Sequence, residues 1–157
     1  CKTCPMKNTP IYVVVFFASI VMSHAQGNKV FKLNQKYATN VVNSIFHAAK
    51  SVSFDHLYQL CDPNGFSDRD AKRICSITQL ANSINASAAS DNAKKNLEEF
   101  VTIFKSGKIT GDVVYEKKGD TEFAKIPIWY DHPSGESRSN ETMVLVKRTG
   151  KWYLYSF

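Results

Sequence analysis

Four cysteines are the most reactive side chains of this chain, and their spacing allows different chemistry in two places. Cys61 and Cys75 would close a loop of about 14 residues, which a disulfide stabilises by about 3 kcal/mol in the chain-entropy model. The alternative is two buried free thiols, and neither has a histidine one helical turn away to activate it as a nucleophile. We expect the disulfide. Cys1 and Cys4 form a C-x-x-C pair that could bind metal or cycle redox states, but both precede Met6, where we expect translation to start.

Carboxylates and histidines are scattered. Asp112 and Asp131 stand on or beside predicted strands, where a carboxylate near a tyrosine could perform acid–base catalysis, although both also suit turns. His47, His56 and His132 are isolated, and the chain has no zinc-protease, EF-hand, P-loop, dinucleotide or nucleophile-elbow motif. We therefore expect neither a metal site nor a cofactor.

Aromatic residues are plentiful in the C-terminal part. Because successive strand residues point to opposite faces, Ile126, Ile128 and Tyr130 share one face, while Phe123 and Trp129 share the other. One face can cover helices. The other would bind a small apolar ligand, meet a second copy of the chain, or carry scattered, half-exposed aromatics without a function. The candidate pocket or interface residues are Tyr58, Tyr115, Phe123, Trp129, Tyr130, Tyr153 and Tyr155.

The segment from Met6 to Gln26 has the pattern of a secretory signal peptide. Lys7 precedes an apolar run over residues 11–22, and Ser23-His24-Ala25 supplies small residues for cleavage after Ala25. The run is shorter than the about 20 residues of a membrane span. The alternatives are an uncleaved anchor and a buried helix. We expect a leader over residues 1–25, a single domain over 26–157, and a secreted or periplasmic protein with no membrane attachment after cleavage.

Charge argues against a nucleic-acid partner. The formal charge is +6, and Lys2 and Lys7 belong to the predicted leader. Nucleic-acid binders gather basic residues on one face or helix. Here Lys94-Lys95, Lys117-Lys118 and Lys147-Arg148 fall in separate predicted elements.

Helices are predicted in the first half of residues 26–157. Apolar residues at helical spacing indicate an amphipathic helix over 36–50 and a short helix over 54–61, with Ser53 as its N-cap. Asp62-Pro63-Asn64-Gly65 is a turn. The sequence from Ser67 to Asp70 resembles a capping box that starts another helix. Residues 82–92 are a loop or a poorly packed helix end, and Asp91 caps a helix over 92–105.

Strands are predicted after residue 109. They cover 110–117, 121–130, 141–148 and 151–157, joined by turns at Lys118-Gly119-Asp120, at 131–135 and at Thr149-Gly150. Pro127 has no N–H to donate and marks an edge or a bulge. The order of elements predicts an α+β fold, with N-terminal helices packed on a curved antiparallel sheet of about four strands.

Two stretches resemble a known family. The sequences GKITGDVVYEKKGDTEFAKIPIWY (107–130) and ETMVLVKRTGKWYLYSF (141–157) are similar to the C-terminal sheet of nuclear-transport-factor-2-like (cystatin-like) domains, in particular small secreted bacterial domains of unknown function. Those domains end in V-x-L-V-K-x-x-G-K-W, whereas here Val144 directly precedes Leu145. The predicted leading helix over 36–50 and the short helix after it (SFDHLYQLCDP) resemble the opening of the family.

The resemblance implies a cone whose open end holds a pocket. Relatives of this fold include ketosteroid-isomerase-like enzymes, dehydratases, and binding or dimerisation modules without catalysis, so the fold alone does not choose among them. We expect a binding module for a small apolar ligand or a protein partner, including a homodimer through the sheet. The alternative is an enzyme that uses a pocket carboxylate and a tyrosine, which requires a buried Asp or Glu with a raised pKa.

Overall fold

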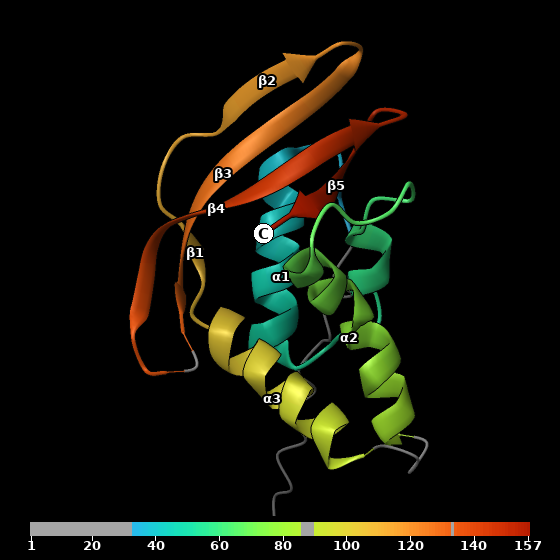
Figure 1. Cartoon of the computed structure of the whole chain (residues 1–157), viewed down its shortest axis with the longest axis vertical. Coiled ribbons are helices and arrows are strands. Elements are labelled where there is room, and N and C mark those ends of the chain that lie inside the picture. Colours follow the sequence, from blue (N-terminus) through green and yellow to red (C-terminus); the bar gives the residue numbers. More distant parts are fainter. Residues whose placement is uncertain (1–32, 86–89, 133) are drawn as a thin grey trace, which may run out of the picture. The chain divides into compact units, whose positions relative to one another are not determined.

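Helices precede a five-stranded antiparallel sheet in the computed structural model, which describes residues 33–85, 90–132 and 134–157 (Figure 1). This confirms the α+β class, with five strands in place of about four. Within these residues the elements are α1 (Ala38–Ser51), the 3₁₀ helix η1 (Leu57–Leu60), α2 (Arg69–Asn85), α3 (Asp91–Phe104), β1 (Lys108–Ile109), β2 (Val114–Lys118), β3 (Thr121–Asp131), β4 (Ser137–Arg148) and β5 (Lys151–Ser156).

The additional strand results from a break opposite Pro127. The predicted strand over 110–117 is divided into β1 and β2, which both pair with β3, so that four residues, 110–113, stand opposite Ile126 and Pro127. The amide of Thr110 donates to the carbonyl of Pro127, but Pro127 has no N–H to return a bond. Its ring also lies against Gly111, where an added Cβ would be 3.0 Å from Pro127 Cγ. The prediction of an edge at Pro127 is therefore wrong, because β3 has partners on both sides; the irregularity lies opposite Pro127, in residues 110–113 between β1 and β2.

One face of the curved sheet packs on the helices (Figure 1). From Ala124 to Ile128, every second residue of β3 is buried, and α1 presents its apolar stripe to the same core. Gly107, which comes after α3, lies so close to the Phe46 ring of α1 that an added Cβ would clash with it. The sheet contributes Ala124, Ile126, Ile128, Met143, Leu145, Trp152 and Leu154, and α1 contributes Ala38, Val41, Val42, Ile45, Phe46, Ala48 and Ala49.

The outer face of the sheet, turned away from this core, has its own small cluster. Val146 is fully buried, yet it lies opposite Phe123 on β3 and Tyr153 on β5. The rings of Phe123 and Tyr155 are 5.2 Å apart, and the ammonium group of Lys118 lies 5.7 Å from the Phe123 ring. These side chains cover one another and leave little open apolar surface at this point.

The segment over residues 61–68 covers the outer edge of β5. Cys61 forms a parallel bridge with Leu154, the amide of Asp62 donates to the Leu154 carbonyl at 3.1 Å, and Ser67 donates twice to the Tyr155 carbonyl. An uncovered edge strand offers unpaired backbone groups to other chains, and this segment pairs those of β5.

The side chain of Asp62 is only 1% exposed and accepts two hydrogen bonds from the guanidinium of Arg148, at 3.3 and 3.0 Å.

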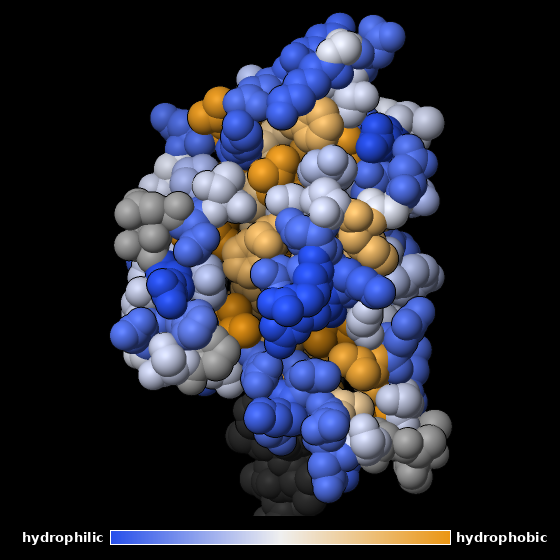
Figure 2. All heavy atoms as spheres, in the orientation of Figure 1, coloured by the Kyte–Doolittle hydropathy of each residue, from blue (hydrophilic) through white to orange (hydrophobic). Residues whose placement is uncertain are grey.

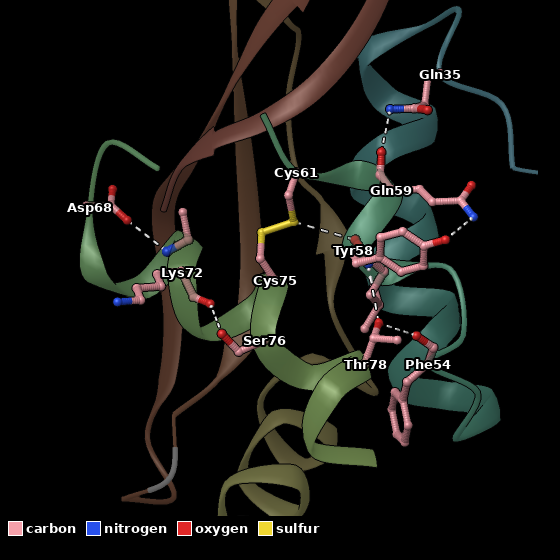
Figure 3. Close-up of a disulfide and its surroundings, with 12 residues drawn as sticks. Gln35, Phe54, Tyr58, Gln59, Cys61, Asp68, Lys72, Cys75, Ser76 and Thr78 are labelled. Carbon is pink, nitrogen blue, oxygen red and sulfur yellow. Dashed lines mark hydrogen bonds between the residues drawn. A yellow bond between two sulfur atoms is a disulfide. The ribbon is translucent and has the colours of Figure 1, made fainter. Parts of the chain in front are cut away.

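A disulfide joins Cys61 to Cys75 and fastens this segment to α2 (Figure 3). This confirms the predicted pairing. One turn further along α2, the buried hydroxyl of Thr78 donates to the carbonyl of Phe54 at 2.6 Å and accepts from the amide of Tyr58 at 3.3 Å. Because Thr78 takes these groups, the predicted helix over 54–61 contracts to η1, and Ser53 does not cap it.

Two other helix starts differ from the prediction by one residue. Asp68 rather than Ser67 caps α2, since its carboxylate accepts from the amide of Ala71 at 2.8 Å, while Ser67 is bonded to Tyr155. Ser90 rather than Asp91 caps α3, accepting from the amide of Ala93. Within the predicted loop or helix end over 82–92, α2 continues to Asn85.

The predicted leader and the Cys1/Cys4 pair lie outside the described residues. Among the residues that the structure does describe, none of the helices is both long and apolar enough to cross a membrane.

The double variant Cys61→Ala/Cys75→Ala should lose about 3 kcal/mol of unfolding free energy, because the cross-link no longer restricts the unfolded chain. Urea unfolding measures this loss. Dithiothreitol should lower the midpoint of the wild type to that of the variant and leave the variant unchanged. An equal midpoint for oxidised wild type and variant would contradict the stabilising role.

Replacing Asp62 by Asn should cost about 2 kcal/mol, since the mostly buried Arg148 then loses its charged acceptor. The matched control is Glu122→Gln, which breaks the more exposed Lys147–Glu122 pair and should cost less than about 1 kcal/mol. Equal losses of unfolding free energy in the two variants would show that the Asp62–Arg148 pair stabilises the fold no more than an exposed ion pair does.

Candidate functional site

A cavity of about 570 Å³ lies between α2, α3 and the ends of β3 and β5; we call it the α2–α3 cavity. Figure 2 shows hydrophilic side chains gathered over the first turns of α2, with apolar patches on either side. The cavity therefore combines an apolar floor with a charged rim.

Four aromatic rings form much of the floor: Phe100, Phe104, Tyr130 and Phe157. Phe104 is their centre, with its ring centroid 5.2 Å from that of Phe100, 6.0 Å from Tyr130 and 5.4 Å from Phe157. Helical spacing places Phe100 and Phe104 on one face of α3, and strand alternation places Tyr130 on the helix side of β3. Ile74, Ile77, Leu80 and Ile103 complete the apolar wall.

The rim carries both signs of charge. Arg73 of α2 donates to Glu99 of α3 at 3.0 Å and lies 4.0 Å from Asp70, so it joins the two helices across the cavity. Arg69 also approaches Asp70 at 4.0 Å, but its side chain is 87% exposed. Lys72, the third cation of the lining, forms no ion pair with a described residue.

Tyr130 gives the floor one polar group. Its hydroxyl makes no hydrogen bond with any residue that the structure describes. Burial raises the pKa of the phenol above its usual 10, and the nearby carboxylate of Glu141 raises it further, against a smaller opposite effect of Arg138. The side chain thus stays a neutral hydrogen-bond donor over the physiological range.

Of the seven aromatic residues predicted for a pocket or interface, Tyr130 lines the cavity. Two others are exposed elsewhere: Tyr58 on η1 is 56% exposed, and Tyr115 on β2 is 61% exposed and packs against Trp152. The remaining four lie on the outer face of the sheet: Phe123, Trp129, Tyr153 and Tyr155. Trp129 there lies beneath the ammonium group of Lys108, at 5.3 Å.

The two carboxylates weighed for acid–base chemistry are not in the cavity lining. Asp112 is exposed in the connection between β1 and β2, and Asp131 accepts a hydrogen bond from Ser106. His132 reaches the rim, with its Nδ1 2.8 Å from the hydroxyl of Ser134. No three His, Cys, Asp or Glu side chains of the described residues gather as a metal site would require.

Sequence reasoning missed the α2 and α3 side chains of the cavity. The stripe with Leu97, Phe100, Val101 and Phe104 had a clear signal, but helical spacing assigns it to the core. The structure confirms this assignment, since Phe100 is 4% and Phe104 2% exposed and both belong to the core cluster. The same spacing cannot show that these core rings also border a cavity.

The raised pKa of Tyr130 gives a direct test. The near-ultraviolet difference titration of wild type against Tyr130→Phe should have its midpoint above pH 10 in the folded protein and near about 10 in denaturant. Folding favours the neutral phenol of Tyr130. Its contribution to the unfolding free energy is therefore present below pH 10 and is lost as the pH rises through the pKa of the folded protein. A folded midpoint at or below the denatured one would contradict the burial of this phenol.

No protein-family model matches this chain, and no curated protein is significantly similar to it. The nuclear-transport-factor-2-like resemblance therefore stays a prediction. Function has to be argued from the chemistry of the site.

Proposed function

We propose that the protein is a secreted or periplasmic binding module whose α2–α3 cavity takes a small apolar ligand. The observation that carries this proposal is the cavity of about 570 Å³ with its aromatic floor. Ligand pockets typically measure about 300–1,000 Å³ and combine apolar walls with a few polar groups that orient the ligand. Tyr130 and the charged rim provide such groups.

The compartment is supported by the covalent chemistry. A disulfide between Cys61 and Cys75 persists in an oxidising environment, such as the periplasm or the cell exterior. The apolar run over residues 11–22 is typical of a secretory leader.

The enzyme alternative has weaker support. An acid–base site of the ketosteroid-isomerase kind needs a carboxylate among apolar side chains. The carboxylates of the lining, Asp70 and Glu99, belong to the rim and face Arg73. Tyr130 packs on Phe104 and Phe157, and the carboxylates that act on its phenol, Glu141 and Asp70, do not lie in an apolar pocket of their own, which favours binding over catalysis.

A protein partner at the outer face of the sheet, including a second copy, is the other alternative. Phe123, Tyr153 and Tyr155 there are half-buried around Val146. Because the cavity offers the deeper apolar surface, we favour the ligand. Native mass spectrometry of the protein from a secreting host separates the two: a retained small adduct supports the cavity, and a dimer without adduct supports the sheet.

Ligand binding can be tested with the neutral fluorescent probe N-phenyl-1-naphthylamine. Ile103→Asn places an amide on the cavity wall and should weaken probe binding about tenfold, because it removes apolar contact. The matched control is Val114→Asn, at an exposed apolar residue of β2 outside the cavity lining. Equal affinities for the two variants, or no binding by the wild type, would refute the cavity as an apolar site.

A further inference from the structure

We propose that the ligand is a monomeric, single-chain amphiphile with an anionic head, such as an alkyl carboxylate, whose head lies at the first turns of α2 and whose tail lies on the aromatic floor. This inference rests on the proposed function and names the class of ligand. Three observations lead to it: the balance of charge on the rim, the position of a free hydroxyl, and the direction of the apolar wall.

The rim has more cations than its own carboxylates can neutralise. The lining holds three basic side chains, Arg69, Lys72 and Arg73, all within the first turns of α2. Its two carboxylates are both within 4.0 Å of Arg73. The contact of Arg69 with Asp70 is long and exposed, and such pairs contribute little. Arg69 and Lys72 are therefore available to an anion from solution.

A neutral donor lies in the same lining. The hydroxyl of Tyr130 makes no hydrogen bond with a described residue. Phe157, which packs on Tyr130 with ring centroids 5.3 Å apart, is fixed to the start of α2, because its amide donates to the Asp68 carboxylate at 3.0 Å. Phe157 thus links Tyr130 to the start of α2, where the basic residues lie, while the charged groups that act on the phenol itself are Glu141, Arg138 and Asp70. An acceptor such as a carboxylate can use both the phenol and the cations.

The apolar wall extends away from the charges. Along α2, the lining changes from Arg69, Lys72 and Arg73 through Ile74 and Ser76 to Ile77 and Leu80, and α3 faces it with the polar Asn96 and Glu99 as well as with apolar residues. A helix rises about 1.5 Å per residue, so the distance from Arg69 to Leu80 is about 16 Å. A flexible apolar tail fits this gradient better than a compact polar metabolite.

The test uses three ligands with one tail and different heads: decanoate, decanol and decyltrimethylammonium, each below its micelle concentration. Isothermal titration of the protein from a secreting host should give the tightest binding for decanoate and the weakest for the ammonium compound. Shortening the carboxylate to octanoate should weaken binding by up to about fourfold per methylene. High salt should reduce the preference for decanoate.

Two charge-matched variants locate the head. Arg69→Gln/Lys72→Gln should weaken decanoate about tenfold or more and change decanol less than twofold. Lys94→Gln/Lys95→Gln removes two exposed cations of α3 that are outside the cavity lining, and should leave both affinities unchanged. Circular dichroism checks that each variant is folded.

The outcomes separate the two proposals. Equal binding of decanoate and decanol would overturn the anionic head and leave the apolar cavity standing. An equal loss of decanoate binding in both variants would also overturn it, since the effect would then be general surface charge. Binding of none of the three would overturn the proposed function itself. Association with vesicles of anionic phospholipid, without binding of monomeric decanoate, would replace the monomer by a membrane surface.

Discussion

The outer edge of β5 must be covered, and the segment that covers it also sets the position of α2. Residues 61–68 supply hydrogen bonds to Leu154 and Tyr155, and their return to α2 is fixed by the Cys61–Cys75 disulfide. Asp68 ends the segment with a double role, because one carboxylate oxygen caps α2 and the other accepts the amide of Phe157. The floor and one wall of the α2–α3 cavity are therefore joined through a single side chain. The ion pair between the buried Asp62 and the partly exposed Arg148 anchors the same segment to β4.

The elements that local chemistry determines could be predicted from the sequence. The apolar stripe of α1, the turn residues Thr149 and Gly150, and the alternation along β3 all correspond to the structure. Predictions failed where a distant group competes for the same atoms. Ser67 has the right chemistry for an N-cap, but the carbonyl of Tyr155 takes its hydroxyl. Thr78 likewise takes the backbone groups that a longer helix over 54–61 would use.

The cavity shows a different limit of sequence reasoning. Phe100 and Phe104 follow the same helical spacing in a closed core and in a pocket floor, so the pattern is silent about which of the two they form. The strand aromatics have a similar ambiguity. Tyr130 and Trp129 are neighbours, yet alternation sends the first to the cavity and the second to the outer face, where Lys108 covers it. Which aromatic residue meets a ligand depends on where the helices end, and this is a tertiary property.

α2 is fastened by different interactions on its two sides. On the side of η1, α2 is held by a covalent bond at Cys75 and by the two hydrogen bonds of Thr78. On the side of α3, the ion pair that crosses the cavity between described residues is Arg73–Glu99, whose partners are partly exposed. An exposed pair contributes little to stability, whereas the disulfide restricts the chain strongly. The ion pair is therefore not what holds α3 in place. Phe100 and Phe104 are 4% and 2% exposed, and Phe104 packs on Tyr130 of β3, so the buried rings fix α3 to the sheet and to α2.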